Sequence, residues 1–289
     1  MKILVCVKQV PDTDHVIVKT GQDGAVSVDG FSGYRINRFD EFAVEEAIRI
    51  KAAMDNVTID VLTVGPPRAG EVLKRACGMG ADRSVHINAQ PDPYVSPFTT
   101  ARAIADYARG KSYSLILTGT MSEDMMNGQV GPMVAAFLDL PCATQVISQG
   151  FVPAPPRRGA DAPDKTDKTE EMNKTVEIDK SDKPDAIDVE REIEGGSREM
   201  LRIGLPAVLA VQTGINEPRY PALSSLLRAN KQKAEAIDAN GLDAGRKNPD
   251  DMVGMAVPEK RRAGVYLEGS AAEKAEALLS MLRDKGILS

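Results

Sequence analysis

Residues 57–87 read VTIDVLTVGPPRAGEVLKRACGMGADRSVHI, and this stretch decides the fold. Residues 57–65 form a nearly continuous apolar, β-branched run, which is typical of a strand buried on both faces of a parallel sheet. Residues 70–79 are predicted to be a helix, and residues 84–87 are a second short strand. A strand, a helix and a strand in this order predict a β-α-β unit.

The same alternation continues in both directions along the chain. Further buried strands are predicted over residues 2–7, 114–119, 143–148 and 205–212, and further helices over 41–54, 97–109 and 132–140. Ser96 and Pro97 mark a helix start, because Ser caps free N–H groups and Pro needs none at the first position. We therefore expect an α/β fold, a three-layer doubly wound, mostly parallel sheet with helices on both faces.

Several segments depart from this alternation. Asp23-Gly24 lies between two β-rich runs over 16–20 and 24–28, which suggests a small hairpin. Residues 187–196 are expected to be a hairpin strand that ends in a Gly-Gly turn. Residues 153–186 are rich in Pro, Asp and Lys, which predicts a disordered surface insert. Helices are expected over 224–237 and 271–286. The predicted organisation is an α/β domain over 1–223, containing the insert, and a C-terminal arm over 224–289.

Composition limits the possible functions of the 289 residues. Two histidines and three cysteines without a CxxC pair argue against metal, iron–sulfur and disulfide sites. A net charge of -6 argues against nucleic-acid binding, and no apolar run approaches the roughly 20 residues of a membrane span. The N-terminus reads as a first strand rather than a signal peptide, and the cysteine usage fits a reducing cytoplasm. We expect a cytoplasmic protein from a bacterium or archaeon. Any cofactor must be held largely by backbone groups.

Ligands of open parallel sheets bind beyond the carboxyl ends of the strands, at the point where the strand order reverses. The loops to examine are therefore residues 7–12, 64–67 and 118–132. Residues 119–131 read GTMSEDMMNGQVG, and three glycines there allow close approach of the backbone to a ligand. Free N–H groups at the start of the following helix could hold a phosphate. Neither a P-loop nor a GxGxxG motif is present, so nucleotide binding and a plain connecting loop both stay open.

A catalytic role for the adjacent acids Glu123 and Asp124 is not expected. General acid–base chemistry needs a nucleophile or a base partner nearby, and the loop supplies neither. Two histidines also give no convincing Ser/His/Asp set. We therefore expect no catalytic residue in this chain.

Longer motifs carry a resemblance to a known family. Residues 189–196 read VEREIEGG, residues 205–211 LPAVLAV, residues 216–223 NEPRYPAL and residues 228–231 RANK. Together with VCVKQVPD (5–12), INRFD (36–40), EEAI (45–48), MGADR (79–83) and FLDLP (137–141), they resemble the beta subunit of electron transfer flavoproteins. The resemblance covers nearly the whole chain apart from the charged insert.

The resemblance implies an electron carrier that works only as a heterodimer with a homologous alpha subunit. Members of the family hold FAD mainly on the alpha subunit and AMP on the beta subunit. They accept electrons from acyl-CoA dehydrogenases or similar flavoenzymes of fatty acid β-oxidation, and pass them to a quinone oxidoreductase or another acceptor. In electron-bifurcating members a second FAD takes the place of AMP.

The family's nucleotide site can be carried over residue by residue. It corresponds to Cys6 at the end of the first strand, to Asn37, Arg38, Phe39 and Asp40, to Val64, and to the loop formed by Gly119, Thr120, Met121, Ser122, Glu123, Asp124, Met125, Met126, Asn127, Gly128, Gln129 and Val130. Leu223, in the loop that contains Tyr220, matches the exposed apolar anchor by which the family docks on dehydrogenases; a packed turn residue is the alternative.

The identity of the nucleotide stays open at this point. Glu123 to Asn127 replace the Asp-rich stretch usual in the phosphate loop, and Gln129 to Pro132 resemble bifurcating members. Residues 137–141 and 216–221 resemble non-bifurcating members, which favours AMP. A stand-alone nucleotide-binding protein of the universal-stress type and a nucleotide-dependent hydrolase are the alternatives from other classes.

Overall fold

The computed structural model describes residues 1–12, 17–20, 26–29, 33–89, 95–152, 184–239, 242 and 264–288. Residues 153–183 of the predicted insert lie outside the described residues. The chain forms two compact units, one of residues 1–18 with 28–253 and one of residues 19–27 with 254–289. The first unit contains the whole large sheet, and each unit is described by itself.

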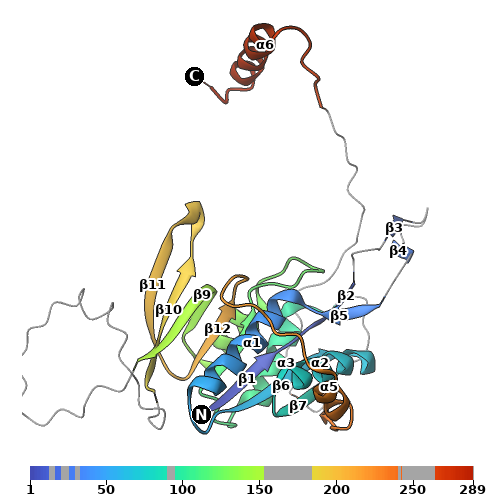
Figure 1. Ribbon diagram of the computed structural model, residues 1–289, viewed down its shortest axis with the longest axis vertical. Helices are drawn as coiled ribbons and strands as arrows, with labels where there is room; N and C mark the ends of the chain where they lie inside the picture. Colours follow the sequence, from blue (N-terminus) through green and yellow to red (C-terminus); the bar gives the residue numbers. More distant parts are fainter. Residues whose placement is uncertain are drawn as a thin grey trace, which may run out of the picture. The chain divides into compact units, whose positions relative to one another are not determined.

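The first unit is built on a nine-stranded sheet with the order β11-β10-β9-β12-β8-β1-β6-β7-β13 (Figure 1). Its strands are β1 (Lys2–Cys6), β6 (Thr58–Gly65), β7 (Arg83–Asn88), β8 (Leu115–Gly119), β9 (Cys142–Val152), β10 (Ala186–Glu192), β11 (Arg198–Gly204), β12 (Ala207–Val211) and β13 (Glu235–Asp238). In this spatial order, the seven strands β9-β12-β8-β1-β6-β7-β13 are all parallel to their neighbours. Strand β10 pairs antiparallel with both β9 and β11. The predicted doubly wound, mostly parallel sheet is confirmed.

Four helices cover the two faces of this sheet. They are α1 (Arg38–Ala53), α2 (Gly70–Met79), α3 (Pro97–Ala108) and α4 (Val130–Leu138). On β1, Ile3 and Val5 pack in the core formed with α1 and α2, whereas Leu4 and Cys6 pack in the core formed with α3 and α4. Alternate residues of a strand point to opposite faces, so the near-continuous apolar runs of the sequence follow from burial on both sides. The result is the predicted three-layer arrangement.

The helix starts follow the sequence closely. The backbone N–H of Thr99 donates to Ser96 Oγ over 3.2 Å, so Ser96 caps α3 as predicted. Two two-stranded sheets complete the described strands. In the first, β2 (Gln9–Pro11) pairs antiparallel with β5 (Tyr34–Ile36), and in the second, β3 (Ile17–Thr20) pairs with β4 (Val26–Asp29). The second pair confirms the hairpin expected around Asp23-Gly24, although its turn lies outside the described residues.

The helix expected over residues 224–237 is wrong in its length. Helix α5 (Leu223–Ala229) ends early, and β13 adds to the sheet edge parallel to β7. Residues 230–234 read NKQKA and offer no large apolar side chain for a helix face, whereas the open edge of β7 offers backbone hydrogen bonds. This part of the segment expected as an arm therefore belongs to the unit that contains the sheet.

The second unit contains α6 (Ala271–Asp284), as the sequence predicts for residues 271–286. Ser270 and Glu273 form a capping box at its start: the Ser270 N–H donates to Glu273 Oε2 over 2.7 Å, and the Glu273 N–H donates to Ser270 Oγ over 3.4 Å. Among the described residues, no helix has both the length and the apolar character needed to cross a membrane.

Candidate functional site

A cavity of about 310 Å³ opens at the carboxyl ends of β1, β6 and β8. The chain runs from β1 outward to β6 and β7 and then returns to β8 on the other side of β1, so the strand order reverses here. The three loops predicted from the sequence all contribute to the cavity wall, and the first turns of α3 and α4 close it. The volume lies at the lower end of the range for small-molecule sites.

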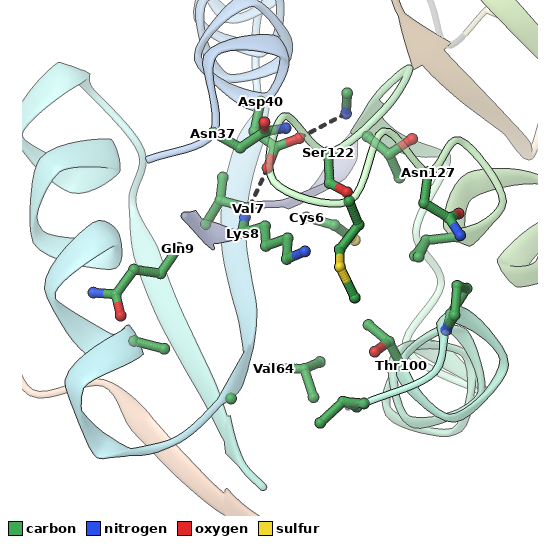
Figure 2. Close-up of a pocket in the computed structure, with 18 of the residues that line it drawn as sticks. Cys6, Val7, Lys8, Gln9, Asn37, Asp40, Val64, Thr100, Ser122 and Asn127 are labelled. Carbon is green, nitrogen blue, oxygen red and sulfur yellow. Dashed lines mark hydrogen bonds between the residues drawn. The ribbon is translucent and has the colours of Figure 1, made fainter. Parts of the chain in front are cut away.

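The predicted site residues divide into two groups. Those that line the cavity are Cys6, Asn37, Asp40, Val64, Gly119, Met121, Ser122, Asp124, Met125, Asn127, Gly128 and Val130. Those outside its lining are Arg38, Phe39, Thr120, Glu123, Met126 and Gln129. Figure 2 shows Asn37, Asp40 and Ser122 on one side of the cavity, with Val64 and Thr100 on the opposite side.

The start of α1 holds the long loop after β8. Asn37 is buried and precedes the helix, but its side chain makes no cap bond. Its Nδ2 donates to the carbonyl of Met121 over 2.9 Å, and its Oδ1 accepts from the N–H of Glu123 over 3.1 Å. One amide side chain therefore satisfies both a donor and an acceptor of the loop backbone, which fixes the loop next to the cavity.

Asp40 ties together the ends of β1 and β8. Its Oδ2 accepts from the N–H of Lys8 over 2.7 Å, and its Oδ1 accepts from the N–H of Gly119 over 3.0 Å (Figure 2). Burial disfavours the charged form and raises the pKa of Asp40 to about 7, although these hydrogen bonds and the nearby Lys8 act in the opposite direction. A carboxyl group that changes charge near neutral pH therefore lies in the cavity wall.

The loop glycines are needed for close packing inside the protein. A Cβ on Gly119 would lie 2.6 Å from Phe39 Cβ and would also collide with Asp40. A Cβ on Gly128 would lie 2.7 Å from the carbonyl oxygen of Thr120, and one on Gly131 would lie 2.6 Å from Thr118 Oγ1. The sequence predicted that these glycines let a ligand approach the backbone closely. The geometry gives a second reason for glycine: a side chain at these positions would collide with other residues of the protein.

The two acidic residues of the loop are both engaged in ion pairs. Glu123 lies 3.2 Å from Arg35 Nη1 and accepts from the N–H of Arg38 over 3.0 Å, whereas Asp124 accepts from Lys8 Nζ over 2.6 Å. These pairs hold both carboxylates at the edge of the long loop. The cavity lining carries two basic residues, Lys8 and Arg68, and two acidic residues, Asp40 and Asp124, with Lys8 paired to Asp124.

The remaining predicted residues outside the lining have structural contacts. Phe39 packs against Gly119, and the N–H of Thr120 donates to the carbonyl of Val211 over 2.9 Å. The N–H of Gln129 donates to Asn127 Oδ1 over 2.9 Å, and Met126 is exposed with a φ of 50°. These residues shape the loop whose backbone and remaining side chains face the cavity.

Cys6 lines the cavity from the end of β1. Burial is the main cause that raises the pKa of its thiol, so the sulfur stays protonated at neutral pH. It therefore contributes a small apolar surface to the wall.

Sequence reasoning missed the wall supplied by α3. Pro97, Thr100 and Ile104 line the cavity from the first eight residues of this helix. The signal was present, because Ser96-Pro97 fixes the helix start and helices of an open parallel sheet begin at the edge where the strands end.

The two predicted docking residues lie outside the cavity lining and are strongly exposed. Tyr220 is 83% exposed and Leu223, the first residue of α5, is 73% exposed. The guanidinium of Arg75 lies 5.4 Å from the centre of the Tyr220 ring. The packed-turn alternative for Leu223 is therefore wrong in this chain, since most of the side chain is accessible.

An open, mostly parallel sheet with a cavity at the point where its strand order reverses defines the class of doubly wound α/β proteins, whose ligands bind at that point. Comparison with known proteins makes this specific. The family model described as "Electron transfer flavoprotein domain" matches residues 27–151. Curated relatives named "Electron transfer flavoprotein subunit beta" include those of Bacillus subtilis (30% identical) and Sus scrofa (33% identical). In both, the alignment covers 99% of this chain and 98% of the relative. This chain belongs to the electron transfer flavoprotein family, among its beta subunits.

Proposed function

We propose that this chain is the nucleotide-carrying and dehydrogenase-docking half of a heterodimeric electron transfer flavoprotein. It binds AMP in the cavity, helps an alpha subunit to position FAD, and docks on acyl-CoA dehydrogenases or similar flavoenzymes. The electrons then pass to a quinone oxidoreductase or another acceptor. FAD supplies the redox chemistry when bound, and this chain contributes binding and orientation without a catalytic residue of its own.

The observation that carries the proposal is the agreement between the cavity and the family's nucleotide site. The cavity is lined by twelve of the eighteen residues that the resemblance assigns to nucleotide binding. Its wall includes Gly119, Gly128 and Gly131, and the start of α4 contributes Val130 and Gly131, where free N–H groups suit a phosphate. These features also fit a chain that is poor in His, Cys and Trp.

The size of the cavity favours AMP over a second FAD. FAD is AMP extended by a second phosphate, a ribityl chain and an isoalloxazine ring, and it needs far more room than AMP. A cavity of about 310 Å³ suits the smaller ligand better. Residues 129–132 resemble those of bifurcating members. For this reason the nucleotide analysis described below also tests for a second FAD.

Partner binding has two candidate elements in this proposal. The first is the docking loop, which we define as residues 216–222 together with Leu223. The second is α6, which has no buried residue and leaves Leu278 and Leu279 exposed. An amphipathic helix of this kind gains stability by burying its apolar stripe, and we propose the alpha subunit as its host.

The experiment is to co-express the chain with its alpha subunit and to release and identify the nucleotides of the purified complex. The expected result is one FAD and one AMP per heterodimer. Two FAD would replace the simple carrier by a bifurcating one. A stable homodimer that takes up no alpha subunit would contradict the proposal and favour a stand-alone nucleotide-binding protein, and ATP turnover that is lost in Glu123→Ala would favour a hydrolase.

A further inference from the structure

The docking loop has no helix or strand of its own before α5 begins, yet it carries the exposed Tyr220 and Leu223. A flexible loop that becomes ordered only on binding loses affinity, because the ordering costs conformational entropy. A loop that is already held in place avoids this cost. In this protein, contacts with α1 hold the docking loop in place.

Arg219 is held on Glu45 of α1 by three hydrogen bonds to a single carboxylate. Its Nε donates to Oε2 over 2.8 Å, its Nη2 donates to Oε1 over 2.9 Å, and its own backbone N–H donates to Oε2 over 3.2 Å. The two side-chain bonds form a planar bidentate pair, whose geometry is more specific than that of a lysine contact. Because the carboxylate also binds the backbone, it fixes the chain direction one residue before Tyr220.

A second contact holds the start of the loop on the next residue of α1. Asn216 Nδ2 donates to Glu46 Oε2 over 2.8 Å and to the carbonyl of Phe42 over 3.0 Å. Gln149 Nε2 donates to the other oxygen of Glu46 over 2.8 Å. Glu45 and Glu46 are both buried. Two buried carboxylates are costly unless they are hydrogen-bonded, and the docking loop supplies partners to both.

The Arg219 pair joins an exposed group to a buried one. The Arg219 side chain is 47% exposed but that of Glu45 is 4% exposed, so removal of the positive charge would leave a buried carboxylate without its partner and would destabilise the fold. A test of positioning therefore has to keep the charge. The bidentate geometry, in turn, restricts the orientation of a short segment. Hydrogen bonding to Glu45 raises the pKa of Arg219, so the guanidinium stays charged at neutral pH.

We propose that Arg219, bound to Glu45, is a positioning residue for docking: it holds the docking loop so that Tyr220 and Leu223 present a preformed apolar anchor to the flavoprotein dehydrogenase. The inference rests on the proposed docking function. Arg219 itself need not touch the dehydrogenase, since it acts through the two residues that follow it.

The deciding variant is Arg219→Lys in the heterodimer with its alpha subunit, because it keeps the charge and removes the bidentate geometry. Electron acceptance from an acyl-CoA dehydrogenase is measured against heterodimer concentration. We expect the half-saturating concentration to rise by roughly five- to tenfold with the maximal rate unchanged, the effect of losing part of the preorganisation. Hydrogen exchange should become faster in residues 213–222, while flavin content and melting temperature stay as in the wild type.

Arg202→Lys is the matched control. Arg202 forms a bidentate pair with Asp188 over 2.7 and 2.8 Å, and its side chain is also 47% exposed, but it lies between two strands of the sheet. This variant should leave the half-saturating concentration and the exchange of residues 213–222 unchanged. An equal effect in both variants would overturn the positioning role.

The double variant Arg219→Lys/Leu223→Ala separates this inference from the function on which it rests. With Leu223 truncated, only the Tyr220 part of the anchor remains to be positioned, so Arg219→Lys should raise the half-saturating concentration by a smaller factor in this background than in the wild type. If Leu223→Ala has no effect, the docking function fails. If Leu223→Ala weakens docking and Arg219→Lys does not, or if the two effects multiply, the positioning role is overturned and the docking function stands.

Discussion

The cavity and the docking loop are both attached to α1, but different kinds of contact build them. At the cavity, Asn37 and Asp40 in the region of the first turn bind backbone N–H and carbonyl groups of neighbouring loops. Along the docking loop, Glu45 and Glu46 bind the side chains of Arg219 and Asn216. The cavity wall is closely packed around glycines, whereas the docking loop leaves large apolar side chains exposed.

This difference has a physical reason. A site for a small ligand needs a wall of fixed shape, and hydrogen-bonded backbone supplies it with little freedom to move. A transient docking surface needs an accessible apolar group on a rigid base, and side-chain pairs can fix a loop without covering its tip. One helix serves both regions through successive turns. Variants in the two regions should therefore have separable effects.

The largest effect is expected from Gly119→Ala in the cavity wall. The added Cβ would lie 2.6 Å from Phe39 Cβ and 2.9 Å from the Phe39 carbonyl carbon, so α1 or the loop has to move. We expect a loss of about 1–3 kcal/mol in the free energy of unfolding and loss of AMP from the purified heterodimer. Urea unfolding and nucleotide analysis measure the two effects.

Gly150→Ala is the control for that variant, because no atom lies within 4 Å of its added Cβ. It should change the free energy of unfolding by less than about 0.5 kcal/mol. Full retention of AMP and stability in Gly119→Ala would show that the close packing at the cavity is not needed.

In the docking loop, Leu223→Ala should weaken dehydrogenase docking without affecting the cavity. Loss of a central apolar anchor costs about 2 kcal/mol, which corresponds to a roughly thirtyfold higher half-saturating concentration. Flavin content, AMP content and the maximal rate should stay unchanged. Met200→Ala, at another exposed apolar residue, is the control. A loss of AMP in Leu223→Ala would mean that the two regions are coupled.

Asp40 gives the cavity a predicted pH dependence. Because its pKa is raised to about 7 in the folded protein, its stabilising contribution is complete below about pH 4 and is lost as the pH rises through 7. Between pH 6 and pH 8 the wild type should lose about 1.4 kcal/mol of unfolding free energy through this group. Asp40→Asn cannot ionise and should lose less. Equal slopes in the two proteins would contradict the raised pKa.

The smallest effect is expected at Lys8, which pairs with Asp124 at the cavity and is partly exposed. Lys8→Gln should weaken AMP binding two- to fivefold at low ionic strength and less at high salt, since salt screens exposed charges. Lys74→Gln is the control, because Lys74 makes a similar pair with Glu71 but does not line the cavity. Equal AMP affinity in Lys8→Gln and wild type at low salt would show that Lys8 does not contribute to binding.

Much of the fold was accessible from the sequence because parallel strands buried on both faces produce apolar runs. The predicted and observed bounds of α2 are the same, residues 70–79. The prediction of a single helix over 224–237 failed, because the structure has the short helix α5 followed by the edge strand β13. No local pattern could indicate β13, because its partner β7 lies about 150 residues earlier in the chain.

The candidate site was predictable to a similar degree. The three loops at the strand ends could be chosen from topology alone, and the family motifs supplied Asn37 to Asp40. No local pattern indicates that Asn37 binds the loop backbone at Met121 and Glu123, since these residues are more than 80 positions apart from it. The same holds for Arg219 and Glu45, which are 174 positions apart.

The sequence by itself determined the alternation of strands and helices, the loops at the carboxyl edge and the family to which the chain belongs. These features depend on local periodicity and on contiguous motifs. Only the tertiary structure decided that Asp40 is buried with a raised pKa, that Gly119 leaves room for Phe39, and that Arg219 binds Glu45. Burial and hydrogen bonding between distant segments arise only when the chain is folded, so residue identity and spacing could not reveal them.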